Sequence, residues 1–175
     1  MTRPACVIVG PPGAGKTTIG NLVATELALA FRDTDADIEA IAGKAIPDIF
    51  FDDGEAVFRT LEKAAVATAL TSFDGILALG GGAVLAEETR RRLTAHTVVF
   101  LSVELADAVS RVGLGVGRPL LTINPRATLK FLLEQRRPLY REVATITVVT
   151  DGRAPEAIAD EVLTALRDRG VAGRR

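Results

Sequence analysis

The sequence of 175 residues contains a single cysteine, a single histidine and no tryptophan. Because a disulfide needs two cysteines, the chain cannot form one internally, which fits a reducing cytoplasm. The same scarcity excludes a zinc site built from cysteine and histidine. Cys6 lies in the apolar run ACVIVG, which favours a buried core residue, and a Cys–His nucleophilic pair would require Cys6 and His96 to meet. Any catalysis therefore depends on lysine, arginine, carboxylates and backbone amides.

Long apolar runs and an excess of one charge are also missing. No stretch approaches the about 20 apolar residues of a membrane helix, and the first residues lack the apolar core of a secretion signal. Lys and Arg number 21 against 22 Asp and Glu, giving a net charge of −1. The arginines are dispersed, and the run RRR at 90–92 is expected to form a solvated helix face. We therefore expect a cytoplasmic protein that binds neither membranes nor nucleic acid.

Short β-rich runs alternate with helical patterns along the chain. The five predicted strands lie within residues 5–10, 31–33, 75–82, 97–103 and 145–150. Helices are predicted in the segments between them, and an amphipathic helix follows the last strand. This order predicts one domain over residues 1–175, a three-layer α/β/α fold with a five-stranded parallel sheet. Residues 170–175 are expected to fray.

A phosphate-binding motif follows the first predicted strand. The segment GPPGAGKTT has the P-loop pattern, with Gly10, Gly15, Lys16 and Thr17 at the required spacing before a predicted helix. Its backbone amides and the helix N-terminus suit a phosphate, Lys16 can reach the β- and γ-phosphate oxygens, and Thr17 offers a hydroxyl to Mg²⁺. The expected nucleotide contacts in this loop are Gly13, Ala14, Gly15, Lys16, Thr17 and Thr18.

The class of P-loop protein is narrowed by two missing elements. The second half of the chain lacks the N/T-K-x-D element that reads guanine, and the strand ILALGGG lacks the acidic end of a motor ATPase. Asp33, which ends the second predicted strand, is then the candidate to support the metal, because the carboxyl ends of parallel strands gather beside the P-loop.

Two excursions from the P-loop core are expected, as in nucleoside-monophosphate-kinase-like folds. Residues 33–62 would bind the acceptor, and residues 113–124 would form a mobile, glycine-rich lid carrying Arg118. Closure of such a lid excludes water, so that the phosphoryl group passes to the substrate.

Several fragments, taken in order, together resemble shikimate kinase. They are GPPGAGKTTIG, DTDADIE, IFFDDGEAVFRTLE, LGGGAV, GRPLL and RRPLYREVA, and the resemblance runs from Val7 to about Asp151. It implies ATP-dependent phosphorylation of the 3-hydroxyl of shikimate, giving shikimate 3-phosphate and ADP on the route to aromatic amino acids. It also implies a requirement for Mg²⁺ and a monomeric enzyme.

The resemblance assigns the acceptor contacts residue by residue. Arg59 and Arg136 would clamp the substrate carboxylate, for which the planar guanidinium is suited. Arg136, and not its neighbour Arg137, stands at the matching position. Asp35 would accept hydrogen bonds from the substrate hydroxyls and orient the attacking oxygen, and Gly81 would donate its amide. The resemblance leaves open whether Asp35 also removes the proton.

At the phosphate end, the resemblance implies that Lys16 and Arg118 neutralise charge on the transferring phosphoryl group. Asp33 would serve Mg²⁺ through water, together with Thr17.

Arg111 and Arg153 match positions that flank adenine, where a guanidinium can stack on the purine. Glu62 is a candidate to orient an arginine. Asp37 falls outside the pattern and is interpreted as an acid in a first helical turn.

Two other functions use the same fold. A kinase for another polyol acid, such as gluconate, is disfavoured by the paired arginines and the DTD segment. A non-catalytic nucleotide-binding module is disfavoured because Lys16, Asp35 and Arg118 are all present.

Overall fold

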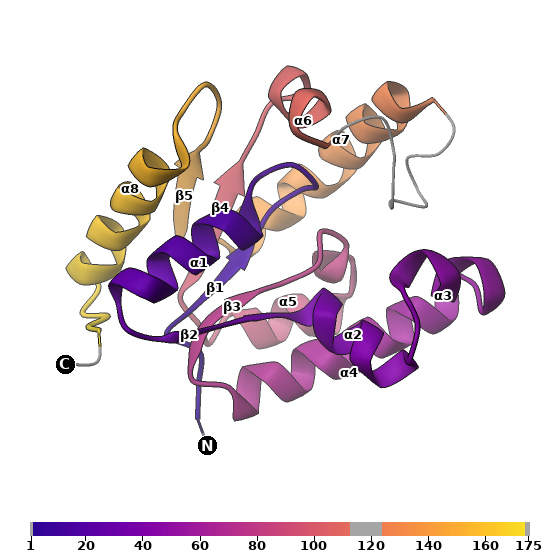
Figure 1. The fold of residues 1–175 in the computed structure, drawn as a ribbon, viewed down its shortest axis with the longest axis horizontal. Helices are drawn as coiled ribbons and strands as arrows, with labels where there is room; N and C mark the ends of the chain where they lie inside the picture. Colours follow the sequence, from indigo (N-terminus) through magenta and orange to yellow (C-terminus); the bar gives the residue numbers. More distant parts are fainter. Residues whose placement is uncertain (1, 113–123, 174–175) are drawn as a thin grey trace.

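The computed structural model describes residues 2–112 and 124–173. Within them, five strands form one parallel sheet, as predicted, and the structure gives their order as β2-β3-β1-β4-β5 (Figure 1). The strands are β1 (Cys6–Val9), β2 (Ala30–Asp33), β3 (Gly75–Ala78), β4 (Val98–Ser102) and β5 (Ile146–Val149). Residues 113–123, which include Arg118 and nearly all of the expected lid, lie outside the described part of the chain.

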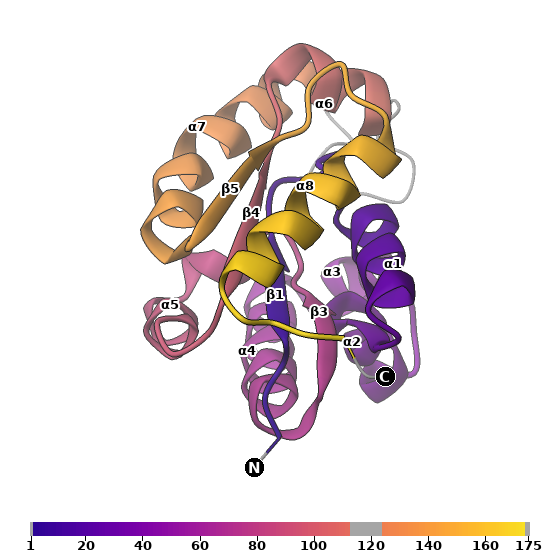
Figure 2. The same cartoon turned by 90° about the vertical axis from the view of Figure 1, so that its left-hand side faces the viewer.

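Helices connect the strands and cover both faces of the sheet. In the described part of the chain they are α1 (Lys16–Glu26), α2 (Thr34–Ala42), α3 (Ile46–Asp52), α4 (Glu55–Ser72), α5 (Glu87–Leu93), α6 (Leu105–Val112), α7 (Pro125–Val143) and α8 (Pro155–Asp168), with a 3-10 turn η1 (Ala83–Leu85). Figure 2 shows α5 and α7 on one side of the sheet and α1 on the other. The predicted α/β/α architecture is therefore confirmed.

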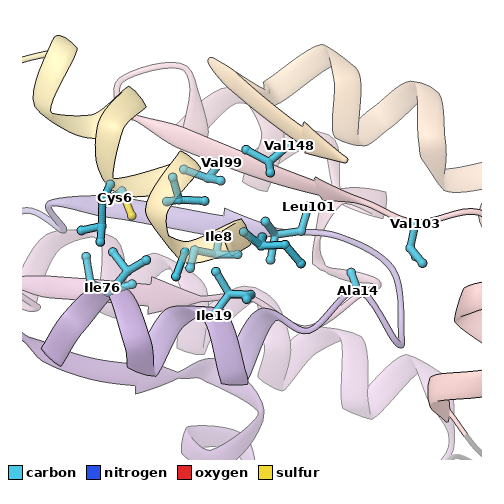
Figure 3. Close-up of a cluster of buried hydrophobic side chains, with 14 of the residues drawn as sticks. Cys6, Ile8, Ala14, Ile19, Ile76, Val99, Leu101, Val103 and Val148 are labelled. Carbon is cyan, nitrogen blue, oxygen red and sulfur yellow. The ribbon is translucent and has the colours of Figure 1, made fainter. Parts of the chain in front are cut away.

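The side chains of β1 point alternately to the two faces of the sheet, and a separate hydrophobic cluster lies on each face. Cys6 and Ile8 point toward α1 and α8, where they join a cluster of buried side chains from four strands and these helices (Figure 3). Val7 and Val9 point to the opposite face and pack with α4, α5 and the end of α7. A strand that is apolar on both faces is the pattern of a sheet covered by helices on both sides. Burial raises the pKa of the Cys6 thiol to about 12, so Cys6 is a core residue and no nucleophile.

A third, smaller cluster of buried hydrophobic side chains packs together the helices that follow β2. Ile38, Ile49, Phe58 and Ala65 come from α2, α3 and α4 and are all buried. Helix α3 was not predicted from the sequence. It is one of the shortest helices, and its apolar residues include Phe51, which is 91% exposed, so its pattern has little amphipathic contrast.

The expectation for the arginine run at 90–92 needs one correction, and the chain after α8 makes contacts of its own. Arg91 and Arg92 are exposed as expected, but the guanidinium of Arg90 donates to the carbonyls of Val84 and Leu85 at 2.8 and 3.1 Å. At the other end, the amide of Val171 donates to the Leu166 carbonyl at 3.0 Å, and its side chain packs on the core. Residue 171 therefore still contacts the core, and fraying of the chain end stays a prediction.

Candidate active site

The P-loop joins β1 to α1 at the carboxyl edge of the sheet. Gly15 precedes the first helical residue with a φ of 88°, and Gly13 has a φ of 81°, values that a residue with a Cβ rarely adopts. A Cβ on Gly13 would also lie 3.0 Å from the carbonyl oxygen of Ala108. The Lys16 ammonium donates to the carbonyls of Gly10 and Pro11 at 2.8 and 3.1 Å, so it lies over the loop that a phosphate would enter.

A cavity of about 550 Å³ lies over this loop. Its lining includes these residues predicted to form the site: Gly13, Ala14, Gly15, Lys16, Thr17, Thr18, Asp33, Asp35, Gly81, Arg111 and Arg153. Pro155 and Ile158 of α8 complete the side next to Arg153. The structure thus gathers residues from the P-loop, β2, α2, the end of β3, α6 and α8 around one volume.

The two residues predicted to support a metal are neighbours. The Thr17 hydroxyl donates to Asp33 Oδ2 at 3.2 Å. The other carboxylate oxygen of Asp33 accepts the amide of Asp35 at 2.9 Å and so caps helix α2. A hydroxyl and a carboxylate are the hard oxygen donors that Mg²⁺ prefers, and Mg²⁺ usually keeps several waters besides such protein ligands. The pair therefore fits Mg²⁺.

Asp35 lies beside the glycines that follow β3. A Cβ on Gly80 would lie 2.5 Å from Asp35 Oδ1 and 3.1 Å from Glu62 Oε1. Two carboxylates therefore abut the backbone of Gly80, and only glycine leaves room for them. Asp37, by contrast, forms an ion pair with Arg32 at 2.8 Å and lies in the first turn of α2, as expected for a residue outside the site.

Behind Asp35, two arginines meet a buried carboxylate. Arg59 Nη1 of α4 donates to Glu62 Oε2 at 2.7 Å, and the same guanidinium lies against Gly82, where a Cβ would overlap it. Glu62 and Arg136 are buried, and within the described residues Glu62 Oε1 and Arg136 Nε have no hydrogen-bond partner. Burial raises the pKa of Glu62 although Arg59 opposes this shift. Burial also lowers the pKa of Arg136.

The choice between the two adjacent arginines of α7 follows from the direction of their side chains. Arg136 is buried, and its charge acts on Glu62 and Arg59. Arg137 points elsewhere, because successive residues of a helix are about 100° apart. Its guanidinium donates to the Val103 carbonyl at 3.4 Å and to the Glu104 carboxylate at 3.3 Å. Arg136 is therefore the one that belongs to the charged cluster.

Both arginines predicted at the adenine end form hydrogen bonds or ion pairs with other groups of the protein. Arg111 donates to the hydroxyl and the carbonyl of Thr150 at 2.9 and 2.7 Å. Arg153 pairs with Glu161 at 2.6 Å and donates to the Val149 carbonyl at 2.8 Å. These bonds fix two guanidinium groups at the wall of the cavity.

Two residues of this region were missed by reasoning from the sequence. The Thr34 hydroxyl accepts the amide of Gly80 at 3.2 Å, and the Tyr140 hydroxyl donates to the carbonyl of Gly81 at 2.5 Å. Each lies within a fragment already singled out, Thr34 in DTDADIE and Tyr140 in RRPLYREVA. Their neutral side chains carried no chemical signal comparable to that of the adjacent charges.

In residues 2–112 and 124–173, no helix is long and apolar enough to cross a membrane. The same residues hold no group of three or more His, Cys, Asp or Glu side chains placed to bind a metal. A metal in this cavity would therefore rest on few protein ligands, such as Thr17 and Asp33.

Comparison with known proteins agrees with this geometry. The shikimate kinase family model matches residues 12–167. A shikimate kinase of Salinispora tropica is 69% identical over 163 residues, which cover 93% of this chain and 98% of the relative. The solved structure of shikimate kinase from Acinetobacter baumannii in complex with shikimate is 36% identical, covers 97% of this chain and 95% of its own, and superposes with a TM-score of 0.91. A gluconokinase from Sinorhizobium meliloti superposes with a TM-score of 0.60 at 21% identity over 94% of this chain and 91% of its own, a likeness of fold alone.

Proposed function

The chain belongs to the shikimate kinase family, and we propose that it transfers the γ-phosphoryl group of ATP to the 3-hydroxyl of shikimate. The products are shikimate 3-phosphate and ADP, and the reaction serves the biosynthesis of aromatic amino acids. The observation that carries the proposal is the charged cluster of Arg59, Glu62 and Arg136 beside Asp35, next to a P-loop cavity. The single cysteine fits a reducing cytoplasm.

At the nucleotide end, the P-loop amides and Lys16 hold the phosphates. To do so, the Lys16 ammonium exchanges its bonds with the Gly10 and Pro11 carbonyls for phosphate oxygens, which are the stronger acceptors for a cation. Arg118, outside the described residues, is the second cation proposed for the transferring group. Arg111 and Arg153 offer guanidinium faces to the adenine.

Thr17 and Asp33 would hold Mg²⁺, directly or through water. When bound, Mg²⁺ neutralises charge on the phosphate oxygens. Asp33 also caps α2 through the amide of Asp35. The same carboxylate thereby links the metal site to the residue that faces the acceptor.

At the acceptor end, a carboxylate and three hydroxyls have to be recognised. Arg59 and Arg136 supply the cations for the carboxylate, and the free Nε of Arg136 is a donor that no other described residue uses. Asp35 accepts from the hydroxyls and orients the attacking oxygen, while Gly81 donates its amide. Positioning and charge neutralisation account for most of the catalysis in phosphoryl transfer.

The reaction is tested by ADP release from Mg-ATP with shikimate, gluconate, quinate or no acceptor. We expect fast release only with shikimate. Release without an acceptor would indicate an ATPase, and release with gluconate alone would favour the other polyol-acid kinase. Nucleotide binding without release in any arm would favour a non-catalytic module.

The acceptor clamp is tested separately by Arg59→Ala. Breaking a desolvated, charge-assisted contact costs on the order of 2–5 kcal/mol, so the KM for shikimate should rise steeply. Arg92→Ala is the control, because Arg92 on α5, like Arg59, pairs with a glutamate about one helical turn away, Glu88 at 2.7 Å, but lies away from the cavity. An Arg59→Ala enzyme with the wild-type shikimate KM would refute the clamp.

A further inference from the structure

The backbone that follows β3 is held by three different elements. The amide of Gly80 donates to the Thr34 hydroxyl at the start of α2, at 3.2 Å. The carbonyl of Gly80 accepts the amide of Ala83, where η1 begins, at 3.0 Å. The carbonyl of Gly81 accepts the Tyr140 hydroxyl from α7, at 2.5 Å. This short segment is thus fixed although it has no side chains of its own.

These bonds determine where the amide of Gly81 points. That N–H belongs to the peptide between residues 80 and 81, whose carbonyl is bonded to Ala83. The peptides immediately before and after it are held by Thr34 and Tyr140. Within residues 2–112 and 124–173 the N–H of Gly81 donates to no protein group, and Gly81 lines the cavity. It is therefore a donor with a fixed direction at the acceptor end.

Both hydroxyl groups are secured by burial. Thr34 is fully buried, and Tyr140 is 1% exposed with its ring stacked on Phe100 at 5.1 Å. Burial raises the pKa of Tyr140, so its hydroxyl keeps the proton that it donates to Gly81. Tyr140 also lies one helical turn after Arg136 and interacts with its charge. The same side chain thereby contacts two of the groups assigned to the acceptor.

We propose that Thr34 and Tyr140 are positioning residues for the acceptor, which aim the Gly81 amide at a hydroxyl of the substrate by holding the peptides on either side of it. The proposal deepens the function inferred above and depends on it. It assigns a role to the threonine between Asp33 and Asp35: its hydroxyl fixes the end of β3 against the start of α2. Neither residue touches the substrate, so their effect reaches it only through the backbone of Gly80 and Gly81.

The test compares Thr34→Val, Tyr140→Phe and the double variant with the wild type. We expect each single change to lower kcat/KM for shikimate at least tenfold, equivalent to about 1.4 kcal/mol. The dissociation constant of Mg-ATP, measured by calorimetry, should stay within about twofold of wild type, because the P-loop is unchanged. The double variant should lose less than the product of the two single losses, since both act on the same peptide segment.

Two further variants separate positioning from general packing. Thr34→Ser keeps the hydroxyl and should restore most of the shikimate activity. Thr89→Val makes the same chemical change at a buried threonine of α5 outside the cavity and should leave kcat/KM unchanged. If Thr34→Val does not fold, Tyr140→Phe carries the test alone.

Wild-type shikimate parameters in Tyr140→Phe and in folded Thr34→Val would overturn the proposal. An equal loss in Mg-ATP affinity would also overturn it, because it would mark a general structural role. A wild-type enzyme that releases no ADP with shikimate would instead refute the proposed function, and the two failures are thus distinguishable.

Discussion

The guanidinium of Arg136 is a buried charge, and replacing it by methionine separates its effect on folding from its effect on the acceptor. The side chain is 4% exposed, its Nε has no hydrogen-bond partner among the described residues, and the charge of Arg59 acts unfavourably on it. Burial lowers its pKa, which means that the fold disfavours its charged form at every pH at which arginine is protonated. A flexible apolar side chain of similar length fills the site without that penalty.

The expected gain in stability is modest. Replacing buried ionic groups by packed apolar ones is often stabilising by about 1–4 kcal/mol. The lower end applies here, because Glu62 also loses a nearby cation, although its main partner Arg59 stays at 2.7 Å. A gain of about 1 kcal/mol raises the Tm of a chain of this size by about 2–4 °C.

The expected loss in function is much larger. If the guanidinium pairs with the substrate carboxylate in a desolvated site, its removal costs about 2–5 kcal/mol. The kcat/KM for shikimate should then decrease by a factor of between about 30 and several thousand. Mg-ATP binding should stay unchanged, because Arg136 does not line the cavity over the P-loop.

The assay combines thermal unfolding by circular dichroism with coupled ADP release. The matched control is Arg137→Met, since Arg137 is adjacent in sequence but donates to Val103 and Glu104. It should leave kcat/KM for shikimate near the wild-type value. An Arg136→Met protein that melts at a lower temperature than the wild type and keeps its shikimate activity would refute both the expected gain in stability and the expected loss in function. If instead Arg137 binds the acceptor, the control Arg137→Met will lose kcat/KM for shikimate.

Other changes test the remaining parts of the site. Lys16→Met should abolish ADP release, because the loop loses its cation, while circular dichroism shows a folded protein; measurable turnover would contradict its role. Asp35→Asn should lower kcat at least about 100-fold, as expected for a group that orients or deprotonates the attacking oxygen, whereas Asp37→Ala should leave turnover nearly intact in the same assay. Removing divalent cations with EDTA should stop ADP release, and added Mg²⁺ should restore it, since Thr17 and Asp33 are oxygen donors. Burial raises the pKa of Glu62 in the folded state, so the folded protein binds its proton more tightly, and Glu62 disfavours folding as pH rises above the ordinary glutamate pKa of about 4.3. Glu62→Gln should remove this contribution, so the Tm of the variant should rise relative to that of the wild type as pH increases above that value.

The sheet could be predicted because its strands are short, apolar on both faces and separated by helical patterns. ACVIVG and TVVFLSV are runs of this kind, and they became β1 and β4 at the centre of the sheet. Helix α3 gave no such signal, because the position of IPDIFFD is set by packing on α2 and α4 through Ile49 and not by a periodic apolar face. The order of the strands could not be read from composition, since it depends on which crossover packs against which face.

The residues of the site can also be separated into those that the sequence could place and those that it could not. Residues with strong chemistry at a fixed spacing, such as Lys16, Thr17 and Asp33, could be placed from the sequence, and the structure brings them together. The choice of Arg136 over Arg137 followed a resemblance, and only the direction of each side chain gives it a physical reason. Thr34 and Tyr140 act through hydrogen bonds to backbone 46 and 59 residues away in the chain, and no local pattern encodes such contacts.

The buried charges and the backbone glycines beside this cavity depend on each other. A glycine at 80 leaves room for Asp35 and Glu62, and a glycine at 82 leaves room for the Arg59 guanidinium, so the charges can lie against the main chain. Removing side chains in this way would ordinarily loosen the segment, because glycine gains the most freedom when unfolded. The hydroxyls of Thr34 and Tyr140 restore the lost order from outside the segment. The charged cluster therefore requires the glycines, the glycines require the two hydroxyls, and a change at Thr34 or Tyr140 should be felt at Arg59 and Asp35 although it removes no charge.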